Sequence, residues 1–195
     1  MAADGHAKPP APLRVLRRHD WDRFTTAQEW LYRAAASRET AGNEWTQQGV
    51  AVLTAGVMWD AVRIPYAVLG VDPEQEHDTE ALRGLLAELK LSGPAFCDPY
   101  RPFLYVLVPP GTDRQWPLTL SPAGVECLGG TRPYVHYVGV PRVDRLQPPG
   151  LFWVTLPDGS SRFTDPQRLF QVLHGRVQES TPLQDAPAAL PEVIV

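Results

Sequence analysis

The clearest regularity along this chain is an apolar stripe of helical spacing near its middle. In TEALRGLLAELKLSG, which begins at Thr79, leucines recur at positions i, i+3, i+4 and i+7 and stop before Gly93. This spacing puts the apolar side chains on one face of a helix. We therefore predict a helix that packs on a core through four leucines, which are Leu82, Leu85, Leu86 and Leu89.

Two further helices are predicted from their capping residues. The run Thr26–Glu29 has the form of a capping box, and apolar residues follow it at helical spacing, so a helix is expected from Thr26 to about Arg38. The last helix is predicted to open at Thr164 or Asp165, with a proline in its first turn and Gly175 just past its end.

Apolar runs of strand length fill much of the remaining chain. Gly49–Pro65 holds two such runs separated by an alanine and a glycine, which indicates either a β-hairpin or one strand with a bend. Further along, a buried strand is predicted within Phe103–Thr112 and another after Gly150. Two short strands joined by a Gly-Gly-Thr turn are predicted in Gly124–Gly130 and Pro133–Pro141.

The order of these elements is helix, strand pair, helix, several strands and helix. That order predicts an α+β fold with a mainly antiparallel, mixed sheet packed by helices on one face. Proline clusters at Lys8–Pro12 and Thr181–Pro191 indicate flexible tails. We therefore expect disordered tails at residues 1–12 and 178–195 around a single domain at residues 13–177.

Composition narrows the classes of partner. Of the 195 residues 44% are hydrophobic, which suffices for one core, and the formal net charge is −4 with a pI of about 5.7. This charge argues against a wide basic surface that binds nucleic acid. It does not exclude a local binding groove. The N-terminus lacks the apolar segment of a signal peptide, and no stretch is apolar enough for a membrane span, so we expect a cytoplasmic protein without membrane contact.

One acid, Asp60, interrupts the strand-like apolar run GVMWDAVRIP. A carboxylate buried without a partner is costly, so Asp60 must either bind a ligand or be satisfied by the fold. No Walker-type phosphate loop, nucleophile elbow, HExxH zinc motif or CxxC pair occurs in the chain. The histidines are scattered, and His136 is interpreted as a hydrogen-bonded core or surface residue of a strand.

A family resemblance rests on five stretches in a fixed order. They are GVMWDAVRIPYAVLGV, GPAFCDPYRPFLYVLVPPGT, GVECLGG, YVHYVGVP and GLFWVTLPDG. In order, spacing and character they resemble the bifunctional DNA primase/polymerase family of the archaeo-eukaryotic primase superfamily, over roughly Trp45 to His174. The resemblance implies a primase/polymerase-like fold with an RRM-like core. In that family, strand carboxylates at i and i+2 hold the divalent metals of nucleotidyl transfer.

The resemblance places the first metal carboxylate at Asp60, but its i+2 partner is Val62, which cannot bind a metal. It places the motif histidine at Phe103, the third acid at Glu126 and an arginine at Leu128. Only the two acids keep the chemistry of a ligand, so the metal-ligand set is incomplete. The resemblance therefore implies a degenerate site that needs no cofactor, with Mg or Mn required only by an enzyme of shifted chemistry.

Three roles stay open for Asp60. In the first, Asp60 is a structural acid that pairs with Arg63 or Arg132 or accepts backbone hydrogen bonds. In the second, it contacts a ligand together with Glu126. In the third, it is part of a working two-metal centre. The resemblance predicts that Asp60 and Glu126 lie on adjacent strands of one sheet, with Val62 on the Asp60 face. The structural role is favoured, and no residue is assigned as catalytic or as a metal ligand.

The expected function is a non-catalytic binding or regulatory module for a nucleotide, DNA, or a replication or regulatory protein. One alternative is a metal-dependent nucleotidyl-transfer or nucleotide-processing enzyme that uses Asp60 and Glu126, with Asp98 or His136 as a third group. The other alternative is a protein-interaction scaffold whose pocket has closed. Local phosphate contacts are predicted from five arginines, Arg101, Arg114, Arg132, Arg142 and Arg145. The oligomeric state is left open.

Overall fold

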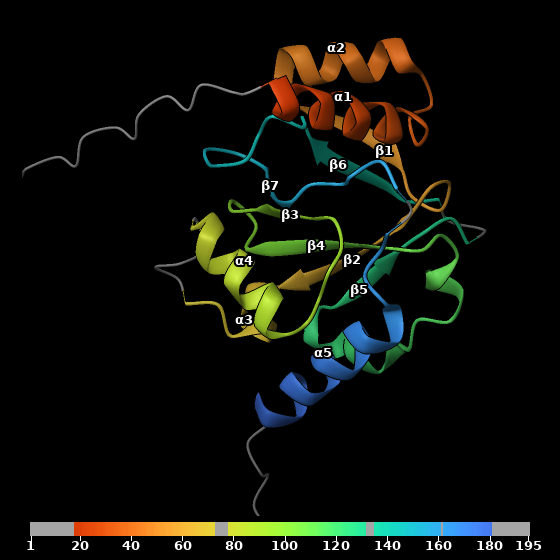
Figure 1. Cartoon of the computed structure of the whole chain (residues 1–195). Coiled ribbons are helices and arrows are strands. Elements are labelled where there is room, and N and C mark those ends of the chain that lie inside the picture. The colour runs from red at the N-terminus through yellow and green to blue at the C-terminus, as the bar shows by residue number, and fades with distance from the viewer. Residues whose placement is uncertain (1–17, 73–77, 132–134, 161, 181–195) are drawn as a thin grey trace, which may run out of the picture.

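A five-stranded antiparallel sheet in the order β5-β2-β4-β3-β7 lies at the centre of the molecule (Figure 1). The computed structural model describes residues 18–72, 78–131, 135–160 and 162–180. The strands of the sheet are β2 (Asp60–Pro65), β3 (Ala95–Asp98), β4 (Phe103–Val108), β5 (Glu126–Leu128) and β7 (Phe152–Thr155). β2 pairs with β4 on one side and β5 on the other, so neither of its edges is free.

A smaller sheet of two antiparallel strands lies over one face of the central sheet, and helices cover the other face (Figure 1). The small sheet consists of β1 (Val50–Thr54) and β6 (Tyr137–Pro141), and it shares its core with α1 (Arg18–Tyr32) and α2 (Arg38–Gln48). The opposite face is covered by α3 (Tyr66–Leu69), α4 (Thr79–Glu88), α5 (Pro166–Ser180) and the 3-10 turn η3 (Leu118–Ala123). A second 3-10 turn, η2 (Thr112–Arg114), follows β4.

The two faces of the central sheet bury separate apolar cores. Val62 and Val106 belong to the core under α3, α4 and α5, whereas Ala61 and Leu107 belong to the core under the small sheet. The predicted α+β class and antiparallel pairing are confirmed. The expectation of helices on one face holds for the central sheet, and its other face is covered by the small sheet. Both faces need cover because β2 and β4 carry apolar residues at consecutive positions.

The segment between β1 and β2 carries the chain from one sheet to the other. The N–H of Gly56 donates to the carbonyl of Trp59 over 2.8 Å, and this turn separates two strands that pair with different partners. The β-hairpin alternative for Gly49–Pro65 is therefore wrong. Gly56 has a φ of +86°, and a Cβ there would lie 2.3 Å from the backbone of Gly130, so only glycine fits this crossing.

The two short strands predicted in Gly124–Gly130 and Pro133–Pro141 also belong to different sheets. β5 pairs with β2, and β6 pairs with β1. The segments meet only near the turn, where the N–H of His136 donates to the carbonyl of Gly129 over 3.1 Å. The predicted turn lies partly outside the described residues, since residues 132–134 are not described.

The observed helices match the predicted ones best where a capping residue and an apolar stripe occur together. In α4, Oδ1 of Asp78 accepts the N–H groups of Glu80 and Ala81, and the leucine stripe faces the core as predicted. The predicted cap at Thr26 is wrong, because Thr26 lies inside α1 and its hydroxyl donates to the carbonyl of Asp22. α5 begins where predicted but continues through Gly175.

Both chain ends extend beyond the described residues. α5 includes residues 178–180, which the sequence analysis assigned to the C-terminal tail. The predicted tail at residues 1–12 and the rest of the C-terminal tail lie outside the described part. Among the helices in that part, none has the length and apolar character needed to cross a membrane.

Candidate functional site

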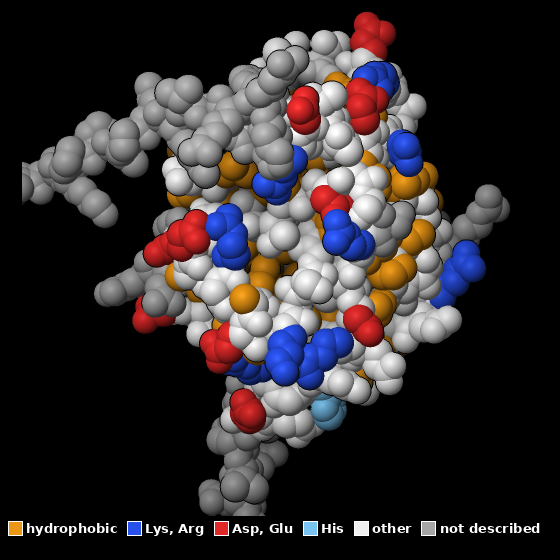
Figure 2. All heavy atoms as spheres, viewed as in Figure 1, with side chains coloured by type: hydrophobic (Ala, Val, Ile, Leu, Met, Phe, Trp, Pro, Cys, Tyr) orange, Lys and Arg blue, Asp and Glu red, His pale blue; other side chains and the backbone are white. Residues whose placement is uncertain are grey.

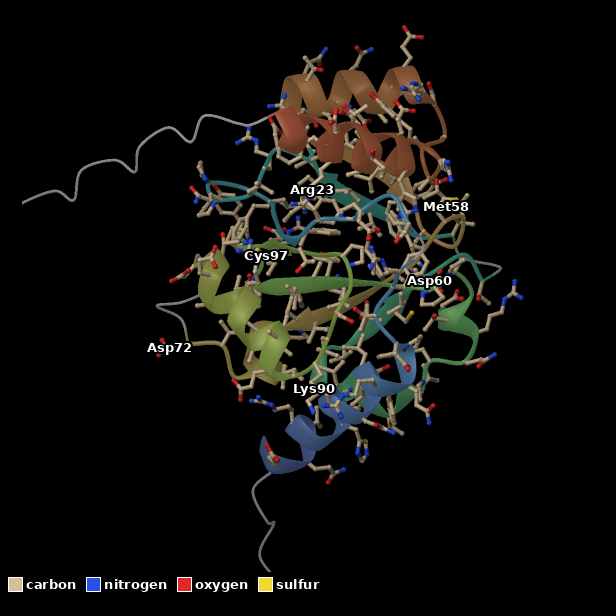
Figure 3. The ribbon with its side chains drawn as sticks, in the orientation of Figure 1. Arg23, Met58, Asp60, Asp72, Lys90 and Cys97 are labelled. Atoms are coloured by element: carbon tan, nitrogen blue, oxygen red, sulfur yellow. The ribbon has the colours of Figure 1, made fainter. Side chains whose placement is uncertain are left out.

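Asp60 is the first residue of β2, and its side chain is fully buried (Figure 3). It lies opposite Val108 of β4. Because side chains alternate along a strand, Asp60 shares its face with Val62, as predicted. Val62 and Val108 both belong to the core under α5, so the carboxyl group borders this apolar core.

The partner of Asp60 is the loop that follows β4. Its Oδ2 accepts the backbone N–H of Asp113 over 2.9 Å, and the side chain of Asp113 in turn accepts the N–H of Thr131 over 2.8 Å. The side chain of Asp113 lies directly against Gly129, where a Cβ would be 2.3 Å from its Cγ. Asp60 therefore connects the central sheet to η2, and Asp113 connects η2 to the segment after β5.

The two carboxyl groups also interact with each other. Burial raises the pKa of Asp60 to about 6, and the nearby negative charge and carboxyl group of Asp113 add to the rise. Burial opposes ionisation of Asp113 too, but hydrogen bonds from Thr131 and the Asp60 carboxyl group leave its pKa below the ordinary value. The Oδ1 atoms of both acids are buried and accept no hydrogen bond from another described group. The backbone N–H groups of Asp113 and Gly111 favour ionised Asp60, so burial is the main cause of its raised pKa.

Glu126 does not join Asp60. It lies on β5, next to β2, so the predicted adjacency of the two strands is confirmed. Its register partner, however, is Arg63, and the two side chains form an ion pair of 2.8 Å. Since Arg63 is an odd number of residues from Asp60, Glu126 and Asp60 lie on opposite faces of the sheet. The shared acid site implied by the resemblance is therefore not assembled.

Arg63 contacts two of the positions that the resemblance singled out, Phe103 and Glu126. Its guanidinium lies 4.7 Å from the ring centroid of Phe103 while it pairs with Glu126. Phe103 therefore shares a face with Glu126 and not with Asp60. Of the structural partners considered for Asp60, Arg63 is wrong, backbone hydrogen bonding is confirmed, and Arg132 lies outside the described residues.

The predicted arginines do not form one patch. Arg101 precedes β4 and Arg114 follows it, so they lie at opposite ends of that strand. Arg142 is paired with Asp144 over 2.6 Å, and Arg145 lies against Gly49. On the face seen in Figure 2, acidic and basic side chains are interspersed and the main group of basic side chains lies over α5.

The remaining candidates for acid, base or metal chemistry have local structural roles. Oδ1 of Asp98 accepts the N–H of Tyr100 in the turn after β3, and Nδ1 of His136 lies 3.0 Å from the carbonyl oxygen of Gly129. Within the described ranges, no three His, Cys, Asp or Glu side chains converge in a way that could hold a metal ion.

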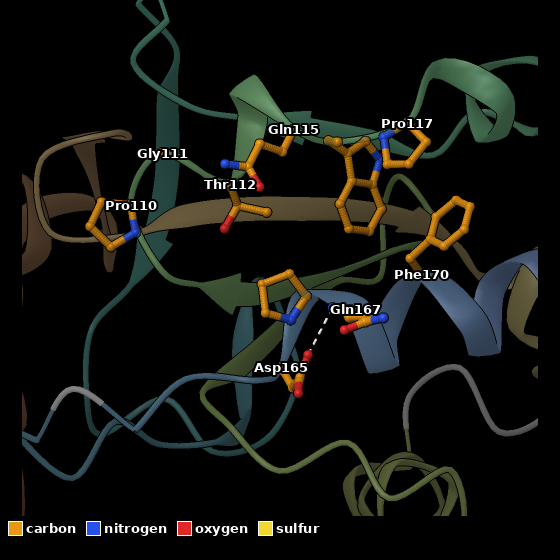
Figure 4. Close-up of a pocket in the computed structure, with 10 residues that line it drawn as sticks. Pro110, Gly111, Thr112, Gln115, Pro117, Asp165, Gln167 and Phe170 are labelled. Atoms are coloured by element: carbon orange, nitrogen blue, oxygen red, sulfur yellow. Dashed lines mark hydrogen bonds between the residues drawn. The ribbon is translucent and has the colours of Figure 1, made fainter.

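Sequence analysis missed a hollow of about 530 Å³ between the loop at residues 110–117, here called the η2 loop, and the start of α5 (Figure 4). Thr112 and Gln115 lie on one side of the hollow, and Asp165 and Gln167 lie on the other. The Pro-Pro-Gly turn and the helix start were both visible in the sequence. Their proximity is a tertiary feature, which no local pattern predicts.

The lining of the hollow combines aromatic and neutral polar side chains with one carboxylate. Trp116 and Phe170 meet edge to face with ring centroids 6.2 Å apart. The Nε1 of Trp116, whose side chain is 8% exposed, has no hydrogen-bond partner among the described residues. Asp165 is exposed and caps α5, because its Oδ1 accepts the N–H groups of Gln167 and Arg168. No Lys, Arg or His is among the described lining residues.

No family model, curated protein or solved structure matches this chain. The resemblance to primase/polymerases therefore stays a prediction. Function must be argued from the arrangement of the side chains themselves.

Proposed function

We propose that this protein is a non-catalytic binding module whose ligand occupies the hollow between the η2 loop and α5. The proposal rests on the burial of Asp60, whose carboxyl group accepts a backbone N–H from the η2 loop. Burying a carboxyl group is unfavourable, and here it connects one wall of the hollow to a strand that is paired on both edges.

The chemistry of the lining supports binding without catalysis. Asp165 is the only described titratable side chain that lines the hollow, and it already accepts two backbone N–H groups as the cap of α5. The hydroxyl of Thr112 donates to the carbonyl of Pro109 over 2.6 Å. General acid–base or nucleophilic catalysis needs a base next to a reactive group, and the described lining does not offer that pair.

The same lining supports a ligand with an apolar ring and a neutral or positively charged group. Trp116 and Phe170 offer aromatic surface, while Thr112, Gln115 and Gln167 offer neutral hydrogen-bonding groups. Asp165 adds a negative charge that favours an ammonium group and opposes a phosphate. A small aromatic amine therefore fits this hollow better than a nucleotide does.

Phenethylamine and phenylacetate form a matched pair of probes, alike in ring and size and opposite in charge. We expect phenethylamine to shift the NMR signals of Gln115, Gln167 and the Trp116 indole in the full chain, with a Kd of about 1 mM. Phenylacetate should leave these signals in place. Equal shifts with phenylacetate, or shifts there with ATP or a short single-stranded DNA, would contradict the proposed ligand class.

Asp165→Asn separates the charge of Asp165 from its capping role, because asparagine is an equally good helix cap. We expect the variant to keep its melting temperature and to bind phenethylamine roughly threefold more weakly, as suits an exposed charge contact. Glu179→Gln is the matched control, since it removes one exposed negative charge near the other end of α5. An unchanged phenethylamine affinity in Asp165→Asn would argue against the proposed placement of the ammonium group.

A further inference from the structure

We propose that Asp60 and Asp113 form a proton-operated latch, in which the proton between their carboxyl groups holds the η2 loop on the sheet and its loss to solvent loosens the loop. The effect of the latch on ligand affinity rests on the proposed function. The loop movement itself does not depend on it.

The two acids belong to parts of the molecule with different freedom to move. Asp60 sits in β2, which is hydrogen-bonded on both edges and packed on both faces. Asp113 sits in a three-residue 3-10 turn flanked by loop. If the contact between them changes, the η2 loop moves and the strand does not.

The η2 turn is hydrogen-bonded to the sheet through this contact, while Trp116 at the end of the loop packs into the core under α5. The bonds of Gln115 N–H to Thr112 and of Arg114 N–H to Gly111 stay within the loop. Among the described residues, the hydrogen bonds that connect η2 to β2 and to the segment after β5 involve Asp60 or Asp113. The latch therefore controls the wall of the hollow that carries Thr112 and Gln115.

No described cation compensates the acids. The groups around Asp60 are Val108 from β4, Asp113 and the exposed Arg114 from η2, and Cys127 from β5. Burial raises the pKa of the Cys127 thiol, and the charges of Asp60 and Asp113 raise it further, so this thiol stays neutral.

Loss of the proton changes the sign of the contact. While Asp60 is protonated, its carboxyl group donates to Asp113 and its other oxygen accepts the Asp113 N–H. After the proton leaves for solvent, the two carboxylates repel each other, while the backbone N–H groups of Asp113 and Gly111 still favour ionised Asp60. Since the pKa of Asp60 is raised to about 6, this change takes place between mildly acidic and neutral pH.

The latch is tested on the full chain by following the side-chain carboxyl carbon of Asp60 by NMR, together with amide exchange in the η2 loop, from pH 4.5 to 8. We expect Asp60 to titrate near pH 6, and exchange at Asp113, corrected for its intrinsic pH dependence, to rise about tenfold across that titration. Titration of Asp60 near its ordinary value, or corrected exchange that does not change with pH, would overturn the latch.

Asp60→Asn imitates the protonated acid, because its amide donates to Asp113 while its oxygen still accepts the Asp113 N–H. We expect its loop to stay closed, with corrected exchange and phenethylamine affinity independent of pH. Asp113→Asn provides a second route, since its amide donates to ionised Asp60 and should lower the Asp60 pKa. Persistent pH dependence of exchange in Asp60→Asn would overturn the latch. If amide exchange in the η2 loop changes with the titration of Asp60 but phenethylamine does not bind, the latch is supported and the proposed function is overturned.

Discussion

At the scale of single residues, the buried acid on β2 is satisfied by backbone and by a second acid rather than by a cation. Arg63, the nearest cation along the strand, pairs with Glu126 on the opposite face. Asp60 instead accepts the N–H of Asp113, and we propose that the two carboxyl groups share a proton. The stability of the fold should therefore depend on whether Asp60 is protonated.

This dependence has a definite sign. The pKa of Asp60 is raised in the folded state from 3.8 to about 6, so its contribution to stability is fully present below about pH 4 and is lost as pH rises through 6. We expect the free energy of unfolding to fall by about 2 kcal/mol between pH 4.5 and 7.5 relative to Asp60→Asn. Urea unfolding of both proteins across this range measures the difference. Parallel pH profiles for the two proteins would contradict the shared proton.

At the scale of elements, local signals in the sequence predicted single elements better than their pairing. The stripe of α4 and the buried run of β4 were both found, because each pattern is set by neighbouring residues. The pairing of β1 with β6 was missed, since nothing in Val50–Thr54 specifies a partner so far along the chain. Likewise the acid at Asp60 was visible in the sequence, but Asp113, in a turn with no periodic pattern, was not.

Indole hydrogen bonds tie α2 and β7 to the small sheet. The Nε1 of Trp45 donates to the carbonyl of Val140 over 2.9 Å, and the Nε1 of Trp153 donates to that of Pro141 over 3.0 Å. Trp30 of α1 is equally buried, but its Nε1 has no hydrogen-bond partner among the described residues. Trp45 and Trp30 are therefore a natural pair for measuring what such a bond contributes.

We expect Trp45→Phe to lower the free energy of unfolding by about 1 kcal/mol more than Trp30→Phe. Both changes remove a similar volume of buried aromatic surface, whereas only the first removes a hydrogen bond. Urea unfolding of the two variants at one pH gives the comparison. If Trp30→Phe proves the more destabilising change, packing and not the bond to Val140 dominates at these sites.

At the scale of the whole molecule, the central sheet keeps apart the acids that polymerase chemistry would bring together. Asp60 borders the core under α5, while Glu126 and Phe103 lie on the opposite face with Arg63. Two-metal nucleotidyl transfer needs several oxygen ligands around the same ions. An antiparallel sheet with this register cannot supply them from Asp60 and Glu126.

We therefore expect no template-directed nucleotide incorporation with either Mg²⁺ or Mn²⁺. Primer extension with the purified full chain tests this, with Asp60→Ala as the comparison variant. The formal net charge of −4 and the dispersed arginines give a template little electrostatic attraction as well. Incorporation by the full chain that disappears in Asp60→Ala would overturn this reading and make an enzyme the better description.

The crossing between the two sheets at residues 55–59 also determines when the protein can fold during its synthesis. β1 is made before β6, its strand partner among the described residues, which ends at Pro141, and β7 follows later still. Until the ribosome has released that much chain, the apolar residues of β1, including Leu53, have no sheet to join. A nascent chain stalled before β6 should therefore remain protease-sensitive, and this domain should reach its native state only after β6 and β7 have been made.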